Sequence, residues 1–223
     1  MGIINNGPHG PFRGRIDNTV YYMLGKKNVS RGIGINTKPP TDLQLRNRMV
    51  TKLCSKFLCV IKDFIGTGFS AEAALMDDNA YNQAVKHNKS QIFEGKYPDV
   101  EIAYERVILS KGRLKPAENW RVTEIPIGLQ FTWHTEPKMS WAEANEQAMM
   151  LAYFPDLDRT EYVLFGNDRI SGSAILELPP SLQGKYMETY LSFIAADRKQ
   201  IADSVYTGSF NKPEATNHPL LTT

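Results

Sequence analysis

Few side chains in this sequence have the type and spacing that catalysis requires. Its histidines are far apart in the chain, and none belongs to a metal-binding or catalytic-triad spacing. Gly32 and Gly34 stand one residue apart, as in a phosphate-binding loop, but neither a third glycine nor a Lys-Ser or Lys-Thr pair follows. We therefore expect a protein that is not an enzyme, with no catalytic residue, no metal ion and no cofactor. The histidines are His9, His87, His134 and His218.

Cys54 and Cys59 are the two cysteines of the chain, and both fall in a predicted helix. At 100° per residue they lie about 140° apart around the helix axis, so they cannot form a disulfide with each other. No second pair of ligands accompanies them to support a metal or redox role. We interpret both as packed thiols.

Some side chains have a chemistry suited to sugars. Trp141, followed by Glu143 and Glu146, could line a sugar-binding loop because aromatic rings stack on sugars, although we favour a loop anchor. Asn28-Val29-Ser30 matches the N-glycosylation tripeptide, and Asp203-Ser204-Val205 resembles an O-glycosylation tripeptide of some Gram-negative bacteria. Asn28 and Ser204 are therefore candidate glycosylation sites, with glycans as candidate partners, if the protein is exported.

Charge is distributed unevenly along the 223 residues, although the formal net charge is only +2. Residues 1–62 contain 11 Lys and Arg against 2 Asp and Glu, whereas residues 63–223 contain 15 against 22. The resulting net charges are +9 and −7. Such a split favours either an acidic partner, such as nucleic acid or a lipid surface, or attraction between copies of the chain.

The composition is that of a globular protein, with 42% hydrophobic and 22% charged residues. No run of about 18 apolar residues is present to span a membrane. The first 30 residues lack the apolar segment of a secretory signal. We expect an extracellular or cell-surface protein that leaves the cell by another route, with the cytoplasm as the alternative.

The elements around these residues are predicted to form an α+β protein. Residues 1–36 form an N-terminal arm of glycine-rich β-strands, with turns at Asp17-Asn18 and Gly25-Lys26. These strands have too few apolar residues for a core of their own, so they must pair with the rest of the chain or with a neighbouring subunit. The strands are predicted at Phe12–Ile16, Thr19–Leu24 and Asn28–Ile35.

Residues 37–98 are predicted to form an antiparallel helix pair. The first helix runs from Thr41 to about Ile65, and the second runs from Asp77 to Phe93. A basic face on the first helix, with Lys52 and Lys56, suits nucleic acid or a membrane surface, although a solvated face or a contact with an acidic subunit is commoner. The stripe that should be buried consists of Leu45, Met49, Leu53 and Phe57.

Residues 99–210 are predicted to form an antiparallel β-sandwich similar to an immunoglobulin or fibronectin type III domain, and residues 211–223 form a tail. The run from Met187 to Phe210 organises it, because two apolar segments flank a polar break and predict a β-hairpin of two strands, Tyr186–Ala195 and Ile201–Phe210. We expect the core to contain Phe131, Trp133, Leu151, Tyr153, Leu176, Leu191 and Phe193. The other strands are predicted at Val100–Tyr104, Arg106–Leu109, Trp120–Ile125, Leu129–His134, Ala148–Phe154, Glu161–Phe165 and Ala174–Leu178.

An N-terminal pattern, N-G-x-x-G-x-F-x-G-[KR], begins at Asn6, and further characteristic residues extend to Gly208. The residues concerned are Asn6-Gly7, Gly10, Phe12, Gly14-Arg15, Thr41, Gln44-Leu45, Arg48, Ala117-Glu118-Asn119, Ser204-Val205-Tyr206 and Gly208. Over nearly its whole length the chain thereby resembles a family of uncharacterised Gram-negative bacterial proteins, known only as a domain of unknown function. The resemblance implies no catalytic residues, and the polar tail after Phe210 departs from the family pattern.

Our hypothesis is a structural, self-assembling protein: a subunit of an extracellular or surface filament, or of a virion-like assembly, joined by β-strand exchange between subunits. Strands without a core, oppositely charged halves and an immunoglobulin-like module without an active site all favour it. The partners are then other copies of the chain. The alternative is a module that binds nucleic acid or a surface through its basic N-terminal region. The residues expected at the intersubunit contact are Gly7, Gly10, Phe12, Gly14, Arg15, Tyr21, Tyr22 and Arg31.

Overall fold

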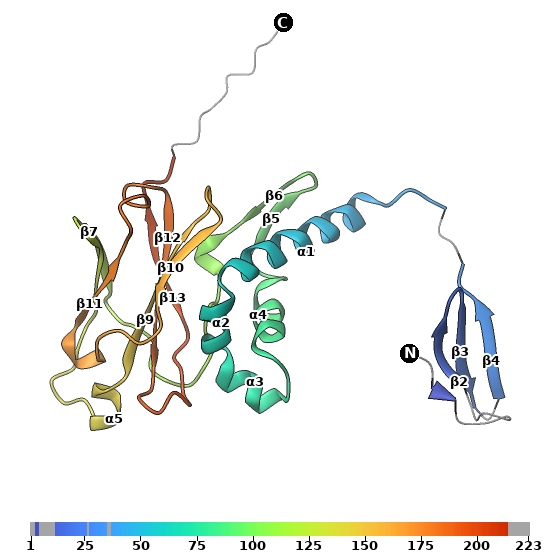
Figure 1. The fold of residues 1–223 in the computed structure, drawn as a ribbon, viewed down its shortest axis with the longest axis horizontal. Coiled ribbons are helices and arrows are strands. Elements are labelled where there is room, and N and C mark those ends of the chain that lie inside the picture. The colour runs from blue at the N-terminus through green and yellow to red at the C-terminus, as the bar shows by residue number, and fades with distance from the viewer. Residues whose placement is uncertain (1–2, 5–11, 26, 35–36, 214–223) are drawn as a thin grey trace, which may run out of the picture. The chain divides into compact units, whose positions relative to one another are not determined.

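A computed structural model describes residues 3–4, 12–25, 27–34 and 37–213 (Figure 1). It has a mixed α+β architecture, and the chain divides into two compact units, Met1–Thr41 and Asp42–Thr223. The predicted turn residue Lys26 and most of the predicted tail, residues 214–223, lie outside the described residues.

The first unit is a four-stranded antiparallel sheet in which the strands follow one another in sequence order. Its second and third strands have the predicted bounds, and its fourth begins one residue earlier than expected and ends at Gly32. Asp17 and Asn18 form the predicted turn, where Asp17 has a φ of 50°, a left-handed conformation that Asp adopts more readily than most residues. The strands are β1 (Ile3–Ile4), β2 (Phe12–Ile16), β3 (Thr19–Leu24) and β4 (Lys27–Gly32).

The second unit begins with four helices where two were expected. The first predicted helix is interrupted at Ile61, whose ψ of 20° departs from the helical value and whose side chain is fully buried. The second predicted helix begins later, because Asp77 adopts a left-handed conformation and Asn79 caps the helix by accepting a hydrogen bond from the Asn82 N–H at 2.8 Å. The helices are α1 (Asp42–Val60), α2 (Lys62–Gly68), α3 (Ser70–Met76) and α4 (Ala80–Asn88), and a short α5 (Trp141–Ala144) follows in the β region.

Three antiparallel sheets complete the second unit. The four-stranded sheet has the order β10-β9-β12-β13, the three-stranded sheet has the order β11-β8-β7, and β5 pairs with β6. The predicted hairpin of the C-terminal run is confirmed, since β12 pairs with β13. The strands are β5 (Phe93–Lys96), β6 (Asp99–Ile102), β7 (Arg121–Ile125), β8 (Gly128–Thr132), β9 (Gln147–Phe154), β10 (Arg159–Val163), β11 (Ser173–Glu177), β12 (Met187–Ile194) and β13 (Val205–Phe210).

The strand predicted at Arg106–Leu109 is not formed. A 3₁₀ turn, Tyr104–Arg106, occupies the start of this segment. A buried side chain then forms the hydrogen bonds that a neighbouring strand would otherwise form. Asn88 accepts from the Ile108 N–H and donates to the Ile108 carbonyl, both at 2.8 Å. An amide side chain can satisfy both backbone groups of one residue, so this segment needs no sheet.

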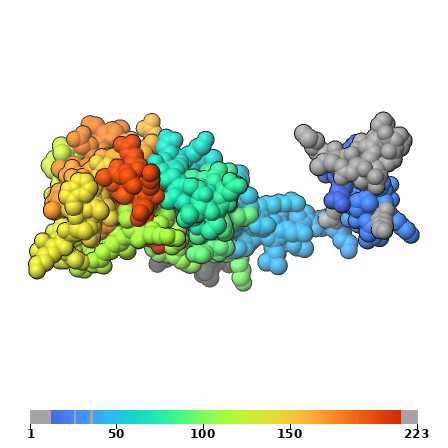
Figure 2. Space-filling model, turned by 90° about the horizontal axis from the view of Figure 1, so that it is seen from below, coloured from blue at the N-terminus to red at the C-terminus, as the bar shows by residue number. Residues whose placement is uncertain are grey.

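The central four-stranded sheet is buried on both faces. All eight residues of β12 are buried, and they alternate between two cores. Leu191 and Phe193 face the three-stranded sheet, whereas Tyr190 and Ile194 face the helices. The second unit therefore has three layers, with helices, four strands and three strands in that order (Figure 1). In the space-filling view the helical segments, cyan to green, lie directly against the strand region, yellow to red (Figure 2).

The seven predicted core residues are all buried, but they do not share one core. Leu151 and Tyr153 belong to the helical side, which is a correction to the prediction that they lie inside the sandwich. The reason is the strand period of two, because Met150, Ala152 and Phe154 of the same strand occupy the sandwich side. A strand such as β9, with seven consecutive buried residues, cannot be assigned an inward face from its sequence.

Helix α1 is rotated relative to the predicted stripe. Of the predicted residues only Phe57 is buried, and Leu45, Met49 and Leu53 are half-buried. The buried line passes through Val50, Cys54, Phe57 and Leu58 instead, one residue further along the helix, while Lys52 and Lys56 are exposed as expected. Cys54 is buried, but Cys59 is exposed, so the interpretation of two packed thiols is wrong for Cys59.

Leu191→Ala should lower the free energy of unfolding by about 2–5 kcal/mol, because it removes a fully buried side chain from a core that relaxes only partly. The measurement is urea denaturation followed by far-ultraviolet circular dichroism. Leu75→Ala is the matched control, since Leu75 is 70% exposed and its loss should change stability by no more than about 0.5 kcal/mol. Equal effects of the two substitutions would contradict the assignment of β12 to the core.

Candidate functional site

The sheet of the first unit contains most of the residues that were expected at a subunit contact. Phe12, Gly14 and Arg15 lie in β2, Tyr21 and Tyr22 in β3, and Arg31 in β4. Gly7 and Gly10 lie outside the described residues. The sheet is therefore the first candidate for a functional surface.

The described side chains of this sheet do not form a hydrophobic core. None of the first-unit side chains whose burial is described is buried, and every one is either half-buried or exposed. Leu24 has an exposed fraction of 64%, and Ile16 is also exposed. Small sheets need a covered apolar face for stability in water, and the described side chains of this unit do not enclose one.

One face of the sheet is basic. Strand pairing places Arg15 opposite Val20 and Val20 opposite Arg31, and residues directly opposite each other share a face. The guanidinium carbon of Arg31 lies 5.8 Å from the ring centroid of Tyr22. We call this the basic face, and its described residues include Arg13, Arg15, Val20, Tyr22, Leu24, Lys27, Val29 and Arg31.

Among the described side chains of the sheet, those on the other face include no Lys, Arg, Asp or Glu. It combines apolar side chains, including Ile16 and Met23, with small or neutral polar side chains. Gly14 has a φ of 124°, a conformation that favours glycine, at the point where β2 lies beside Tyr21. We call this the uncharged face, and it consists of Gly14, Ile16, Thr19, Tyr21, Met23, Asn28, Ser30 and Gly32.

The sheet also presents an edge. Strand β4 is the last in the strand order, and among the described residues it pairs only with β3. On the opposite side, β1 covers only Phe12 and Arg13 of β2. The outer backbone groups of an edge strand are a template for pairing with another chain. The sheet therefore offers three kinds of surface: a basic face, an uncharged face and an open edge.

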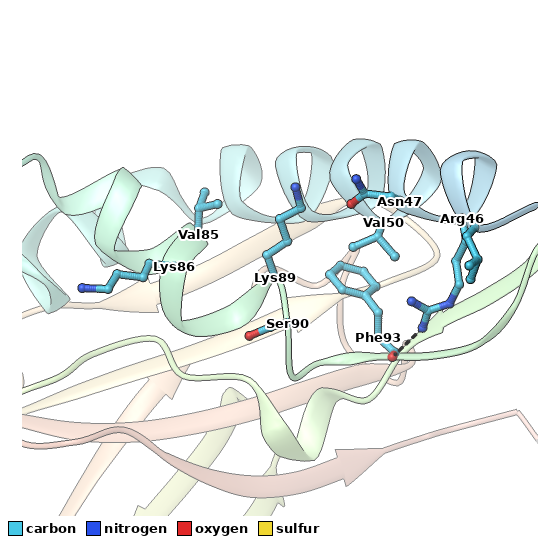
Figure 3. A pocket seen from close by; sticks show the side chains of 9 residues that line it. Arg46, Asn47, Val50, Val85, Lys86, Lys89, Ser90 and Phe93 are labelled. Atoms are coloured by element: carbon cyan, nitrogen blue, oxygen red, sulfur yellow. Dashed lines mark hydrogen bonds between the residues drawn. The ribbon is translucent and has the colours of Figure 1, made fainter. Parts of the chain in front are cut away.

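A groove in the second unit lies between α1, α4 and β5 (Figure 3). It has a volume of about 460 Å³, and Val50 of α1 and Phe93 of β5 form its apolar part. Arg46 donates to the carbonyls of Phe93 and Gly95 at 3.2 and 3.0 Å, which holds its guanidinium at one end. Lys86 and Lys89 add positive charge, and no acidic residue lines the groove. The arrangement suits an apolar group that carries a negative charge.

A buried carboxylate fastens the hairpin of β12 and β13. Glu188 is 1% exposed and accepts hydrogen bonds from the hydroxyls of Tyr186 and Tyr206, the latter at 2.6 Å. Tyr190 donates to the Tyr104 carbonyl at 2.8 Å and thereby connects the hairpin to the 3₁₀ turn. Burial, reinforced by the Glu188 charge, raises the pKa of Tyr104 to about 12 and raises the pKa of Tyr206 further. These phenols stay protonated near neutral pH and act as structural donors.

The tyrosine cluster should make the fold sensitive to alkali. Unfolded tyrosines ionise near pH 10, whereas folded Tyr104 ionises near pH 12, so between these values the unfolded chain has lost protons that the folded chain keeps. The free energy of unfolding should be unaffected by this cluster below pH 10 and should fall between pH 10 and pH 12. Urea denaturation across this range measures it. Tyr206→Phe should weaken the dependence, and an unchanged slope would contradict the role of the cluster.

The candidate glycosylation sites lie in different surroundings. The Ser204 hydroxyl accepts hydrogen bonds from the backbone N–H groups of Leu109 and Ser110, at 2.8 and 3.3 Å, and joins that segment to the hairpin. Nearby Asp203 accepts from the Gly112 N–H, and these bonds explain why β13 begins at Val205 and not at Ile201 as predicted. Asn28 is exposed in β4.

Trp141 is not a loop anchor. Its side chain is 81% exposed at the start of α5, whereas Glu146, expected near the same loop, is buried in an ion pair with Arg169 at 2.7 Å. Arg169 also lies 3.7 Å from the ring centroid of Phe193, and its carbonyl accepts from the Trp133 indole at 2.8 Å. A buried ion pair of this kind orders the core and has no open space for a substrate.

Within the described residues, no three His, Cys, Asp or Glu side chains lie close enough together to hold a metal ion. The Nε2 atom of His87 lies within hydrogen-bond distance of the Glu72 carboxyl, at 2.8 Å, while His9 and His218 lie outside the described part of the chain. No helix there is long and apolar enough to cross a membrane.

Comparison with protein families adds one finding. The sequence profile of a family of unknown function, DUF6266, matches residues 14–208. The chain belongs to this family. The match begins in β2 and ends in β13, so it includes most of the N-terminal sheet and nearly all of the second unit. Most of the glycine pattern that starts at Asn6 precedes the matched residues. Neither the curated proteins nor the solved structures gave a match.

The basic and uncharged faces could not have been separated by composition alone. The predicted contact residues include Arg15, Tyr22 and Arg31 from one face and Gly14 and Tyr21 from the other. The alternation of side chains in β3 separates the two faces, but it can be used only when the pairing register of the neighbouring strands is known. The groove between α1 and α4 left no signal, because it depends on how the helices pack.

Proposed function

We propose that the protein is a non-enzymatic structural subunit that assembles with copies of itself through β-strand pairing by its N-terminal sheet. The observation that carries the proposal is a separate sheet without a single buried side chain among those described in it. Such a sheet gains stability only when another surface covers it or extends it. A second copy of the chain supplies that surface in the proposed assembly.

The open edge and the distribution of charge support this proposal. Strand β4 offers six residues to an incoming strand, and main-chain hydrogen bonds of this kind join subunits in strand-exchange assemblies. Residues 1–41 contain six Lys and Arg against one Asp, and residues 42–223 contain 20 Lys and Arg against 23 Asp and Glu. Opposite net charges speed the encounter of copies, and salt weakens this effect.

The second unit fits the role of a rigid body in such an assembly. Its two packed sheets, four strands against three, support the proposal of an immunoglobulin-like or fibronectin-III-like module with helices added on one side. A filament or virion-like particle at the cell surface or outside the cell is the setting that we propose, and exposed Asn28 and Trp141 are available there for contact with glycans.

Deletion of residues 2–36 should abolish assembly and leave a folded monomer, because the second unit has its own two cores. Light scattering and negative-stain images of the full chain and the deletion variant test this at equal concentration. The melting temperature of the second unit should stay the same and serves as the control for folding. The proposal is wrong if the deletion variant still forms polymers. It is also wrong if the full chain stays monomeric at high concentration and low salt.

A second candidate function rests on the basic face. Arg31 lies beside the ring of Tyr22, and Arg15 and Lys27 lie on the same face of the sheet. Cations beside an aromatic ring are the groups that hold single-stranded nucleic acid. In this reading the sheet binds phosphates electrostatically and stacks a base on Tyr22.

Fluorescence anisotropy with a short single-stranded DNA tests this second function. Arg31→Ser should weaken binding and reduce the slope of log affinity against log salt by about 0.7, the value for one lost phosphate contact. Arg159→Ser, an exposed arginine of β10, is the matched control and should change neither quantity. Equal effects of the two substitutions would exclude the basic face as the binding surface.

A further inference from the structure

We infer that the uncharged face of the N-terminal sheet is the surface buried against a second copy of the chain, while the basic face stays in water. The inference rests on the proposed function and adds to it which side of the sheet is covered. The two faces differ in one decisive respect, the cost of removing them from water.

Burial of the basic face would remove four cations from water. Arg13, Arg15, Lys27 and Arg31 are exposed, and among the described residues of this face no acidic side chain is present to pair with them. A buried charge without a partner is strongly destabilising, and contact between two basic faces would add repulsion between like charges. The basic face is therefore unsuited to meet a copy of itself.

The uncharged face has no such cost. Ile16 and Met23 supply apolar area, and Thr19, Asn28 and Ser30 carry polar groups that can form hydrogen bonds without a charge. Gly14 and Gly32 lack side chains, so a neighbouring surface can approach the backbone there. The face can be covered by a second copy without desolvating an ion.

The size of the face decides what kind of complex it can support. The three longer strands, β2 to β4, lie about 4.8 Å apart and are five or six residues long, and with the two-residue β1 they give a flat area of roughly 300 Å². Two such surfaces together remain below the roughly 1,200 Å² that stable specific interfaces bury. The face contact alone therefore does not hold an isolated dimer, and it acts together with strand pairing at the β4 edge. Assembly should depend steeply on concentration.

A pair of neighbouring substitutions in β3 tests the inference with the full-length protein. Met23→Glu places a charge on the uncharged face, and Leu24→Glu places the same charge one residue away on the basic face. Met23→Glu should raise the concentration at which assembly begins by at least about tenfold, a factor that corresponds to about 1.4 kcal/mol. Leu24→Glu should change it by less than about threefold. Sedimentation velocity measures both.

A second measurement does not depend on how well these variants fold. Asn28→Cys and Lys27→Cys, each combined with Cys59→Ser, introduce adjacent thiols on the uncharged and basic faces of β4. In the assembled protein the thiol at position 28 should react with a maleimide at least about tenfold more slowly than in the monomer. The thiol at position 27 should keep its monomer rate.

The outcomes separate the inference from the proposed function. If the wild-type chain assembles but Met23→Glu and Leu24→Glu act equally, or the thiol at position 27 is the protected one, the face assignment is wrong and assembly stands. If the wild-type chain does not assemble at any concentration tested, the proposed function fails and the inference fails with it. Nucleic acid that protects the thiol at position 27 in an unassembled chain would assign the sheet to the second function.

Discussion

The burial of both faces of one β-sheet is the constraint on which the second unit depends. Strands β9 and β12 supply every second residue to the helices and the intervening residues to the smaller sheet. Because both cores use the same two strands, a shift of register in either strand would disrupt both cores. The hairpin of β12 and β13 is fixed accordingly, by the Glu188 carboxylate on one side and by paired threonines on the other, where the Thr207 hydroxyl donates to that of Thr189 at 2.7 Å. The three layers therefore form one cooperative body.

The N-terminal sheet is stabilised in a different way. It is bounded by turns and held by backbone hydrogen bonds, but its described side chains enclose nothing. The second unit has two cores, whereas the described side chains of the sheet enclose none, and under the proposed function the sheet is completed by contact with another copy. In the second unit several buried polar groups hold loops and strands together. Asn88, Ser204 and Arg169 each serve the backbone or a partner within the fold.

Much of the fold was predictable from the sequence, and the limits have physical causes. The alternation of side chains along the chain predicted β3, β12 and the hairpin well, because the side chains on one or both faces of these strands are uniform in polarity. It failed for Leu151 and Tyr153, since a strand that is apolar throughout has no polar residues to mark which side is which. It also failed at Arg106–Leu109, where Asn88, twenty residues earlier, supplies the hydrogen bonds that a neighbouring strand would give. At the candidate surface the residue types were foreseen, but their division between two faces required the pairing of the strands.

The alternation in β3 makes the N-terminal sheet more sensitive to chain length than to residue identity. Exchanging one apolar side chain for another on either face keeps the distribution of charge, so many sequences can present the same two surfaces. A single inserted or deleted residue between Asn18 and Gly25 would turn every following side chain of β3 over and exchange residues between the basic face and the uncharged face. Natural variation in this region should therefore consist of replacements at constant spacing, with length changes confined to the turns or to the connection after β4.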